Sequence, residues 1–145
     1  MSNDEHSPAL ADPAVRVTRD GPVALVMLAR PAKSNAMDGE VTCALLDAVR
    51  SLAESGDVRA MVLTGDGTVF SAGGDIQTIR EMAADREVRD TILDAHQELL
   101  WAMTRLPFAS VAAVNGAAVG AGVTIALLCD LVVRSEEHTS ELQSL

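Results

Sequence analysis

Apolar and polar residues first alternate with the period of β-strands. Residues 15–19 alternate in character, which predicts a half-exposed strand, and residues 23–28 are apolar on both faces, which predicts a buried one. The Asp-Gly-Pro sequence at residues 20–22 separates these segments and predicts a turn. We therefore expect a β-hairpin, followed by an irregular loop over residues 30–37, RPAKSNAM.

Helical spacing appears in two longer segments. Apolar residues recur at helical intervals over residues 41–52, where Asp38 is placed to cap the helix and Gly56 to end it. Residues 88–106 carry one apolar stripe, which predicts a helix that ends before Pro107. We expect two amphipathic helices that each bury one face.

Two further segments each combine a short apolar strand, a glycine-bearing loop and a helix. Residues 60–64 lead into the loop GDGTVFSAGGD. Its last residue, Asp75, is expected to cap a helix over residues 76–84. The sequence SVAAVNGAAVGAGVTIALLCD, residues 110–130, repeats that order. Strands that alternate with helices indicate an α/β fold whose sheet faces are covered by helices.

The two loops are the strongest candidates for chemistry. Residues 70–75 and 115–122 each follow a buried strand and precede a helix, so they are expected to open at the same sheet edge. There the backbone N–H groups of Gly74 and Ala121 would converge on one oxygen, as in an oxyanion hole. The alternative is that both loops are only tight turns in which glycine relieves strain, and spacing alone leaves both open.

Composition narrows the class of protein. The chain has 145 residues, 48% hydrophobic, which suits one globular domain, and its formal net charge of −10 argues against a nucleic-acid partner. Cys43 and Cys129 lack zinc or disulfide spacing, so we expect reduced cytosolic core residues and no metal. Dinucleotide and P-loop fingerprints are absent from the sequence, and Ser71 lacks the context of a hydrolase nucleophile.

A membrane span and a signal peptide are two further interpretations of apolar and terminal segments. Residues 109–128 are twenty uncharged residues with GxxxG spacing, long enough to cross a bilayer. The Asn-Gly pair at residues 115–116 and Asp130 favour a strand, a turn and a helix instead, with no membrane partner. Residues 1–14 are polar and acidic, which predicts a disordered leader rather than a signal peptide, and a cytoplasmic protein.

Single polar residues have structural interpretations. His96 lies on an apolar stripe, where a hydrogen-bonded histidine is more common than a catalytic base. Asp130 follows an apolar run and is expected to cap or turn the chain. Arg30 and Lys33 would reach either a phosphate or only water.

Three motifs, RPAKSNAM, TVFSAGGDI and AAVNGAAVGAGVTIALLCD, taken in this order, resemble the enoyl-CoA hydratase/isomerase family, the crotonases. The resemblance spans residues 15–133, roughly the N-terminal half of a family domain. It implies a crotonase-like spiral of β-β-α units, truncated here, that assembles into trimers or dimers of trimers. It also implies an acyl-CoA thioester substrate from fatty acid metabolism, with coenzyme A as part of the substrate and no other cofactor.

The resemblance also assigns roles to individual residues. It gives the oxyanion-hole N–H groups to Gly74 and Ala121, where a thioester enolate would be stabilised. Thr124 stands where hydratases of the family carry a glutamate, and a hydroxyl cannot replace that base, so isomerisation is favoured over hydration. The alternative is a non-catalytic CoA-thioester-binding or scaffold protein of the same fold. Positions implied along the CoA groove are Lys33, Ser34, Ala36, Ala72, Asp75, Ile76 and Gly120.

The end of the chain departs from the family pattern. Residues 134–144 read RSEEHTSELQS, a peptide that a widely used sequencing adapter would encode. We therefore expect residues 134–145 to be a non-native tail, with a natural charged terminus as the alternative. The family's second catalytic carboxylate would then be missing, and this fragment is expected to be inactive and to expose apolar surface.

Overall fold

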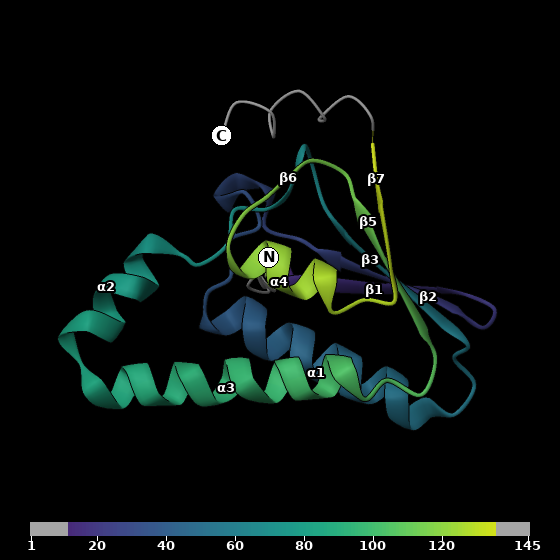
Figure 1. The fold of residues 1–145 in the computed structure, drawn as a ribbon, viewed down its shortest axis with the longest axis horizontal. Helices are drawn as coiled ribbons and strands as arrows, with labels where there is room; N and C mark the ends of the chain where they lie inside the picture. The colour runs from purple at the N-terminus through teal and green to yellow at the C-terminus, as the bar shows by residue number, and fades with distance from the viewer. Residues whose placement is uncertain (1–11, 136–145) are drawn as a thin grey trace, which may run out of the picture.

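Five strands form the main sheet of the computed structural model, which describes residues 12–135 (Figure 1). Their order is β1-β2-β3-β5-β7, with β1 antiparallel to β2 and the later neighbours parallel. A separate parallel pair is formed by β4 and β6. The strands are β1 (Val15–Asp20), β2 (Val23–Leu28), β3 (Ala60–Gly65), β4 (Val69–Ser71), β5 (Ala109–Val114), β6 (Ala117–Ala118) and β7 (Leu131–Arg134).

The helices connect these strands. A short 3-10 turn, η1 (Pro31–Lys33), follows the hairpin and precedes α1 (Gly39–Ser55). The segments α2 (Ile76–Ala84) and α3 (Arg86–Thr104) join β4 to β5, and α4 (Ala121–Leu127) joins β6 to β7. In Figure 1, α1 and α3 run side by side, whereas α2 lies beyond the N-terminal end of α3. The predicted α/β fold is thus confirmed.

Local signals explain where α1 begins and ends. The Asp38 carboxylate accepts a hydrogen bond from the Val41 N–H at 2.8 Å, and Gly56 ends the helix in the left-handed conformation at φ 73°. The apolar face of α1 packs on β1 and β2, and α3 packs on α1. The core includes Ala24, Val26, Leu28, Val41, Leu45, Val49, Met61, Leu63, Leu99 and Met103.

Some expectations about local structure were wrong. The two cysteines do not share the core, because Cys43 lies on the exposed face of α1 and only Cys129 is buried. Burial raises the pKa of the Cys129 thiol to about 11, since the thiolate would be poorly solvated there. The loop over residues 30–37, which was expected to be irregular, contains η1, and the two glycine-bearing loops contain β4 and β6.

Residues 109–128, the apolar segment long enough to cross a bilayer, contain β5, β6 and α4 rather than one helix. Within residues 12–135 no helix combines the length and the apolar character needed to cross a membrane. Most of the predicted leader and tail, residues 1–11 and 136–145, lies outside the described residues. Of the described remainder, Ala14 is buried and its carbonyl accepts the Ala29 N–H, and Arg134 ends β7.

Candidate active site

The parallel strands β3 and β5 bring the two glycine-bearing loops to one edge of the sheet. Both loops contain a short strand, and β4 pairs with β6 there, Val69 opposite Ala117 and Ser71 opposite Ala118. The loops therefore lie side by side, as their positions after neighbouring strands predict.

Close backbone contacts hold the two loops together. The Val119 N–H donates to the Ser71 carbonyl at 3.0 Å. A Cβ on Gly73, whose φ is 86°, would lie 2.6 Å from the Val119 carbonyl oxygen, and a Cβ on Gly122 would lie 2.7 Å from the Ser71 Cβ. Glycine is required at both positions, because the loops approach more closely than a side chain allows.

Two backbone amides in these loops remain available. Among residues 12–135, neither the Gly74 N–H nor the Ala121 N–H donates a hydrogen bond. Two neighbouring amides are engaged: the Gly73 N–H donates to the Ser71 hydroxyl, and the Gly122 N–H donates to the Val119 carbonyl. Because Gly74 is exposed and Ala121 is half-buried, both N–H groups are open to a ligand.

The orientation of each amide follows from the carbonyl that precedes it. In a trans peptide the C=O and the next N–H point in opposite directions. The Gly73 carbonyl accepts the Met37 N–H at 2.6 Å, so the Gly74 N–H is directed away from Met37. The Gly120 carbonyl accepts the Thr124 N–H, so the Ala121 N–H is directed away from the body of α4.

The loop that follows the hairpin lies beside the first of these amides. The Ala72 N–H donates to the Ser34 carbonyl at 2.9 Å, and Met37 forms a parallel bridge with Gly74. Ser34, Ala36 and Ala72 are thereby brought together, and the exposed Lys33 contributes its positive charge to the neighbourhood of Asp75.

The remaining predicted groove residues lie at helix starts. Ile76 begins α2 and is 67% exposed, so its side chain makes little contact with the other groove residues. Gly120 is the N-cap of α4 at φ 50°, a conformation that favours glycine.

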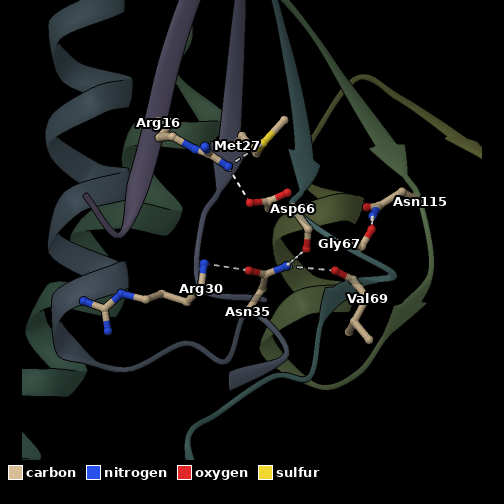
Figure 2. A network of polar contacts seen from close by, with 8 residues as sticks. All are labelled: Arg16, Met27, Arg30, Asn35, Asp66, Gly67, Val69 and Asn115. Carbon is tan, nitrogen blue, oxygen red and sulfur yellow. Dashed lines mark hydrogen bonds and ion pairs between the residues drawn. The ribbon is translucent and has the colours of Figure 1, made fainter. Parts of the chain in front are cut away.

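A buried asparagine, which sequence reasoning missed, fixes the loop over residues 30–37 (Figure 2). Asn35 is fully buried at φ 52°; its Oδ1 accepts the Arg30 N–H, and its Nδ2 donates to the carbonyls of Asp66 and Val69. All its amide atoms therefore bind backbone. The only signal in the sequence is an asparagine in a loop, a residue type that tolerates positive φ.

Asn115 plays the same role after β5. Its Oδ1 accepts the Gly65 N–H at 3.1 Å and its Nδ2 donates to the Gly67 carbonyl at 2.9 Å, a contact drawn in Figure 2. Asn35 thus joins the loop over residues 30–37, and Asn115 the loop over residues 115–122, to the segment that connects β3 with β4.

The carboxylates flanking the site are committed to structure. Asp75 accepts the N–H and the hydroxyl of Thr78 as the N-cap of α2, and these bonds lower its pKa. Asp130 accepts the N–H and the hydroxyl of Ser110, which lowers its pKa in the same way. Both expected structural roles are confirmed, and a carboxylate with a lowered pKa is a weak proton acceptor.

Other polar candidates are also accounted for. The Thr124 hydroxyl is exposed and donates to the Gly120 carbonyl at 3.3 Å. His96 Nδ1 lies 3.0 Å from the Ile92 carbonyl oxygen, so the structural interpretation of His96 is confirmed. Arg30 pairs with Glu40, whose carboxylate raises the pKa of the guanidinium.

A groove of about 420 Å³ lies elsewhere, between the C-terminal turns of α1 and α3. Its lining includes Arg50, Glu98, Trp101 and Arg105, and it is at the opposite end of α1 from Met37 and Gly74. Within residues 12–135, no cluster of three potential metal ligands occurs. The candidate site is therefore the pair of amides at the sheet edge.

Comparison with known proteins extends this picture. The sequence model of the enoyl-CoA hydratase/isomerase family matches residues 18–143. The chain is 34% identical over 131 residues to a 4-chlorobenzoyl coenzyme A dehalogenase of Arthrobacter sp, covering 89% of this chain and 48% of that protein. It is 33% identical over 120 residues to the 2,3-dehydroadipyl-CoA hydratase of Escherichia coli K12, covering 83% and 46%.

Solved structures agree with the sequence comparison. An enoyl-CoA hydratase/isomerase from Mycobacterium paratuberculosis matches with a TM-score of 0.82 and 34% identity, over 86% of this chain and 50% of that one. An enoyl-CoA hydratase homologue from Thermobifida fusca YX in complex with acetoacetyl-CoA matches with a TM-score of 0.73 and 32% identity, over 86% and 51%. The chain spans about half the length of the relatives it matches.

Proposed function

Since the chain belongs to the enoyl-CoA hydratase/isomerase family, we propose that it binds an acyl-CoA thioester and polarises the thioester carbonyl. The Gly74 and Ala121 N–H groups donate to the carbonyl oxygen. The observation that carries this proposal is that both amides lack an acceptor among the described residues, on loops joined by the Ser71–Val119 hydrogen bond. The similar T. fusca structure, which is in complex with acetoacetyl-CoA, supports the ligand class.

The chemistry that follows from two such donors is enolate formation. Removal of a proton next to the carbonyl moves negative charge onto the carbonyl oxygen, where preorganised donors stabilise it. Losing one such donor typically lowers kcat by about 10²- to 10³-fold. The loop over residues 33–36 would hold the coenzyme A part beside Ala72, and Lys33 would meet its phosphates.

The reaction proposed for the full-length protein is isomerase-like rather than hydration. Thr124 has no titratable group near neutral pH, and its hydroxyl is bound to the Gly120 carbonyl. Their own hydrogen bonds lower the pKa values of Asp75 and Asp130, which makes both carboxylates weak proton acceptors. The proton acceptor would therefore come from outside residues 12–135, and this chain alone is expected to bind thioester without turning it over.

The lack of a proton acceptor at Thr124, Asp75 and Asp130 also favours a second candidate, a non-catalytic binding or scaffold protein. Such a full-length protein would bind the thioester but would never exchange its α-proton. Exchange measured by NMR in D₂O discriminates the two, because an enolate-forming enzyme incorporates deuterium and a scaffold does not.

Two features of the full-length protein complete the proposal. Assembly into trimers or dimers of trimers is supported by the exposed apolar side chains of Leu127, Leu131 and Val133, because exposed apolar side chains are typical of interfaces. A cytoplasmic location is supported by Cys43 and Cys129, which are both free.

The test measures whether the 145-residue chain binds cinnamoyl-CoA. The absorption of this conjugated thioester shifts to longer wavelength when its carbonyl is polarised. Ala121→Pro removes one donor at the first position of α4, where proline is tolerated. Ala121→Gly keeps the N–H and is the matched control. We expect a red shift with the wild type and Ala121→Gly that is reduced with Ala121→Pro; an unchanged shift in the proline variant would contradict the assignment of Ala121.

A further inference from the structure

Ser71 is a buried polar residue that contacts every segment of the candidate site. Its side chain is fully buried at the end of β4, directly after the buried Phe70. Sequence reasoning excluded Ser71 as a nucleophile, and the proposed function gives it no other role. A hydroxyl in such a place is expected to be held by hydrogen bonds, and those bonds define what it does.

The hydroxyl joins the first two segments. The Ser71 Oγ donates to the Asn35 carbonyl at 2.8 Å and accepts the Gly73 N–H at 3.2 Å. Together with the bond from the Met37 N–H to the Gly73 carbonyl, these contacts fix both peptide groups of Gly73. The peptide on the C-terminal side of Gly73 contains the Gly74 N–H, so its direction is fixed as well.

The rest of Ser71 joins the third segment. Its carbonyl accepts the Val119 N–H at 3.0 Å, and its Cβ packs directly against Gly122 at the start of α4. Ala121 lies between these two contacts. Ser71 therefore touches the supports of both available amides, one through its side chain and the other through its backbone and Cβ.

We propose that Ser71 is a positioning residue, whose hydroxyl sets the direction of the Gly74 N–H relative to the Ala121 N–H. This inference rests on the proposed function, because it takes these amides as the carbonyl-binding pair. Gly73 is the flexible point, since its left-handed φ of 86° is held only by the loop around it. Without the hydroxyl, the Gly73 N–H and the Asn35 carbonyl lose their partner. The peptide that carries the Gly74 N–H then keeps its bond to the Met37 N–H but loses this second support, so it turns more easily.

The experiment compares two variants of Ser71 with a matched buried serine. Ser71→Ala removes the hydroxyl, and Ser71→Cys keeps a weaker hydrogen-bonding group. Ser110→Ala is the control, because Ser110 is 2% exposed and also loses a buried hydroxyl, yet its partner is Asp130 rather than the loops. Each 145-residue chain is titrated with cinnamoyl-CoA and with a thioether analogue that lacks the carbonyl.

We expect Ser71→Ala to lose about tenfold in affinity for the thioester and most of its red shift, with unchanged affinity for the thioether. Ser71→Cys should fall between Ser71→Ala and the wild type, and Ser110→Ala should keep the full red shift. Folding of each variant is checked by circular dichroism. A general loss of structure would weaken both ligands equally, so the difference between them isolates positioning.

The outcomes separate the inference from the proposed function. If the wild type gives no red shift, the proposed function fails and the inference fails with it. If the wild type gives the shift and a folded Ser71→Ala keeps it, only the inference is overturned. Should Ser71→Ala fail to fold, hydrogen exchange of the Gly73 amide in the wild type decides: slow exchange supports the bond to Ser71, and fast exchange overturns the inference.

Discussion

The face of the sheet covered by α1 and the edge formed by α4 and β7 are built very differently. Six residues of α1, Val41, Thr42, Leu45, Leu46, Val49 and Leu52, are buried. All four residues of β7 are exposed, and Leu127 in α4 is 69% exposed. One region completes a core within the described residues, whereas the other presents apolar side chains to solvent.

This difference has a consequence for the site, because each region supports one of the two amides. The Gly74 loop is anchored to the segment before α1 through Asn35 and Met37. The Ala121 N–H begins α4, whose outer face is uncovered. Since the chain spans about half the length of its relatives, the α4 side of the site is the one expected to gain most from further contacts.

The largest expected effect comes from truncating one leucine in each region. Leu45→Ala removes a fully buried side chain of α1 and is expected to lower the free energy of unfolding by about 2–5 kcal/mol. Leu127→Ala, in α4, should change it by less than about 0.5 kcal/mol, because that side chain is already exposed. Urea denaturation measures both, and equal losses would show that the two regions are equally well packed.

A pair of glycines tests the contact between the loops, with an intermediate effect. A Cβ on Gly116 would overlap the Thr68 carbonyl oxygen, so Gly116→Ala must displace backbone where the loops meet; we expect a loss of about 1–3 kcal/mol. Gly39→Ala at the start of α1 is the control, since nothing lies within 4 Å of its added Cβ. The control should be neutral or slightly stabilising in the same denaturation assay. A neutral Gly116→Ala would mean that the loops tolerate separation.

The regions also differ in how far the sequence predicted them. The helix α1 was predictable because its signals are local: the Asp38 cap, the apolar spacing and Gly56 all lie within or beside it. The strands β4 and β6 have three and two residues, too few to show a period, and their pairing depends on contacts between distant segments. Cys43 was misplaced because it was assigned to the core from its residue type, although it lies on the exposed face of α1.

For the proposed site, the positions of the two loops and the resemblance to a family both pointed to Gly74 and Ala121, while spacing alone left tight turns as an equal alternative. Ser71 and Asn35 carried no comparable signal, because the hydrogen-bond partners of their side chains lie up to 36 residues away in sequence. A serine within a short apolar strand looks unremarkable until its hydrogen bonds are known. Residues that support a backbone site are therefore harder to predict than the glycine-bearing loops that carry it.

The smallest expected effect concerns the hydrogen bonds that tie the end of α4 to the start of β5. Asp130 accepts two hydrogen bonds from Ser110, and these bonds lower the pKa of the carboxyl in the folded state. A lowered pKa means that the ionised form stabilises the fold above the unfolded-state pKa of about 3.9, and that this stabilisation is lost as pH falls through the folded-state value.

Asp130→Asn keeps an oxygen acceptor for the Ser110 N–H but does not titrate. We expect the variant to melt below the wild type at pH 6, by less than Gly116→Ala does, and the difference to shrink as pH falls toward 2. Asp47→Asn is the control, because Asp47 is exposed on α1 and accepts no hydrogen bond from residues 12–135. A melting difference between Asp130→Asn and the wild type that stays constant with pH would show that the Asp130 charge contributes nothing, leaving only packing to hold α4 against β5.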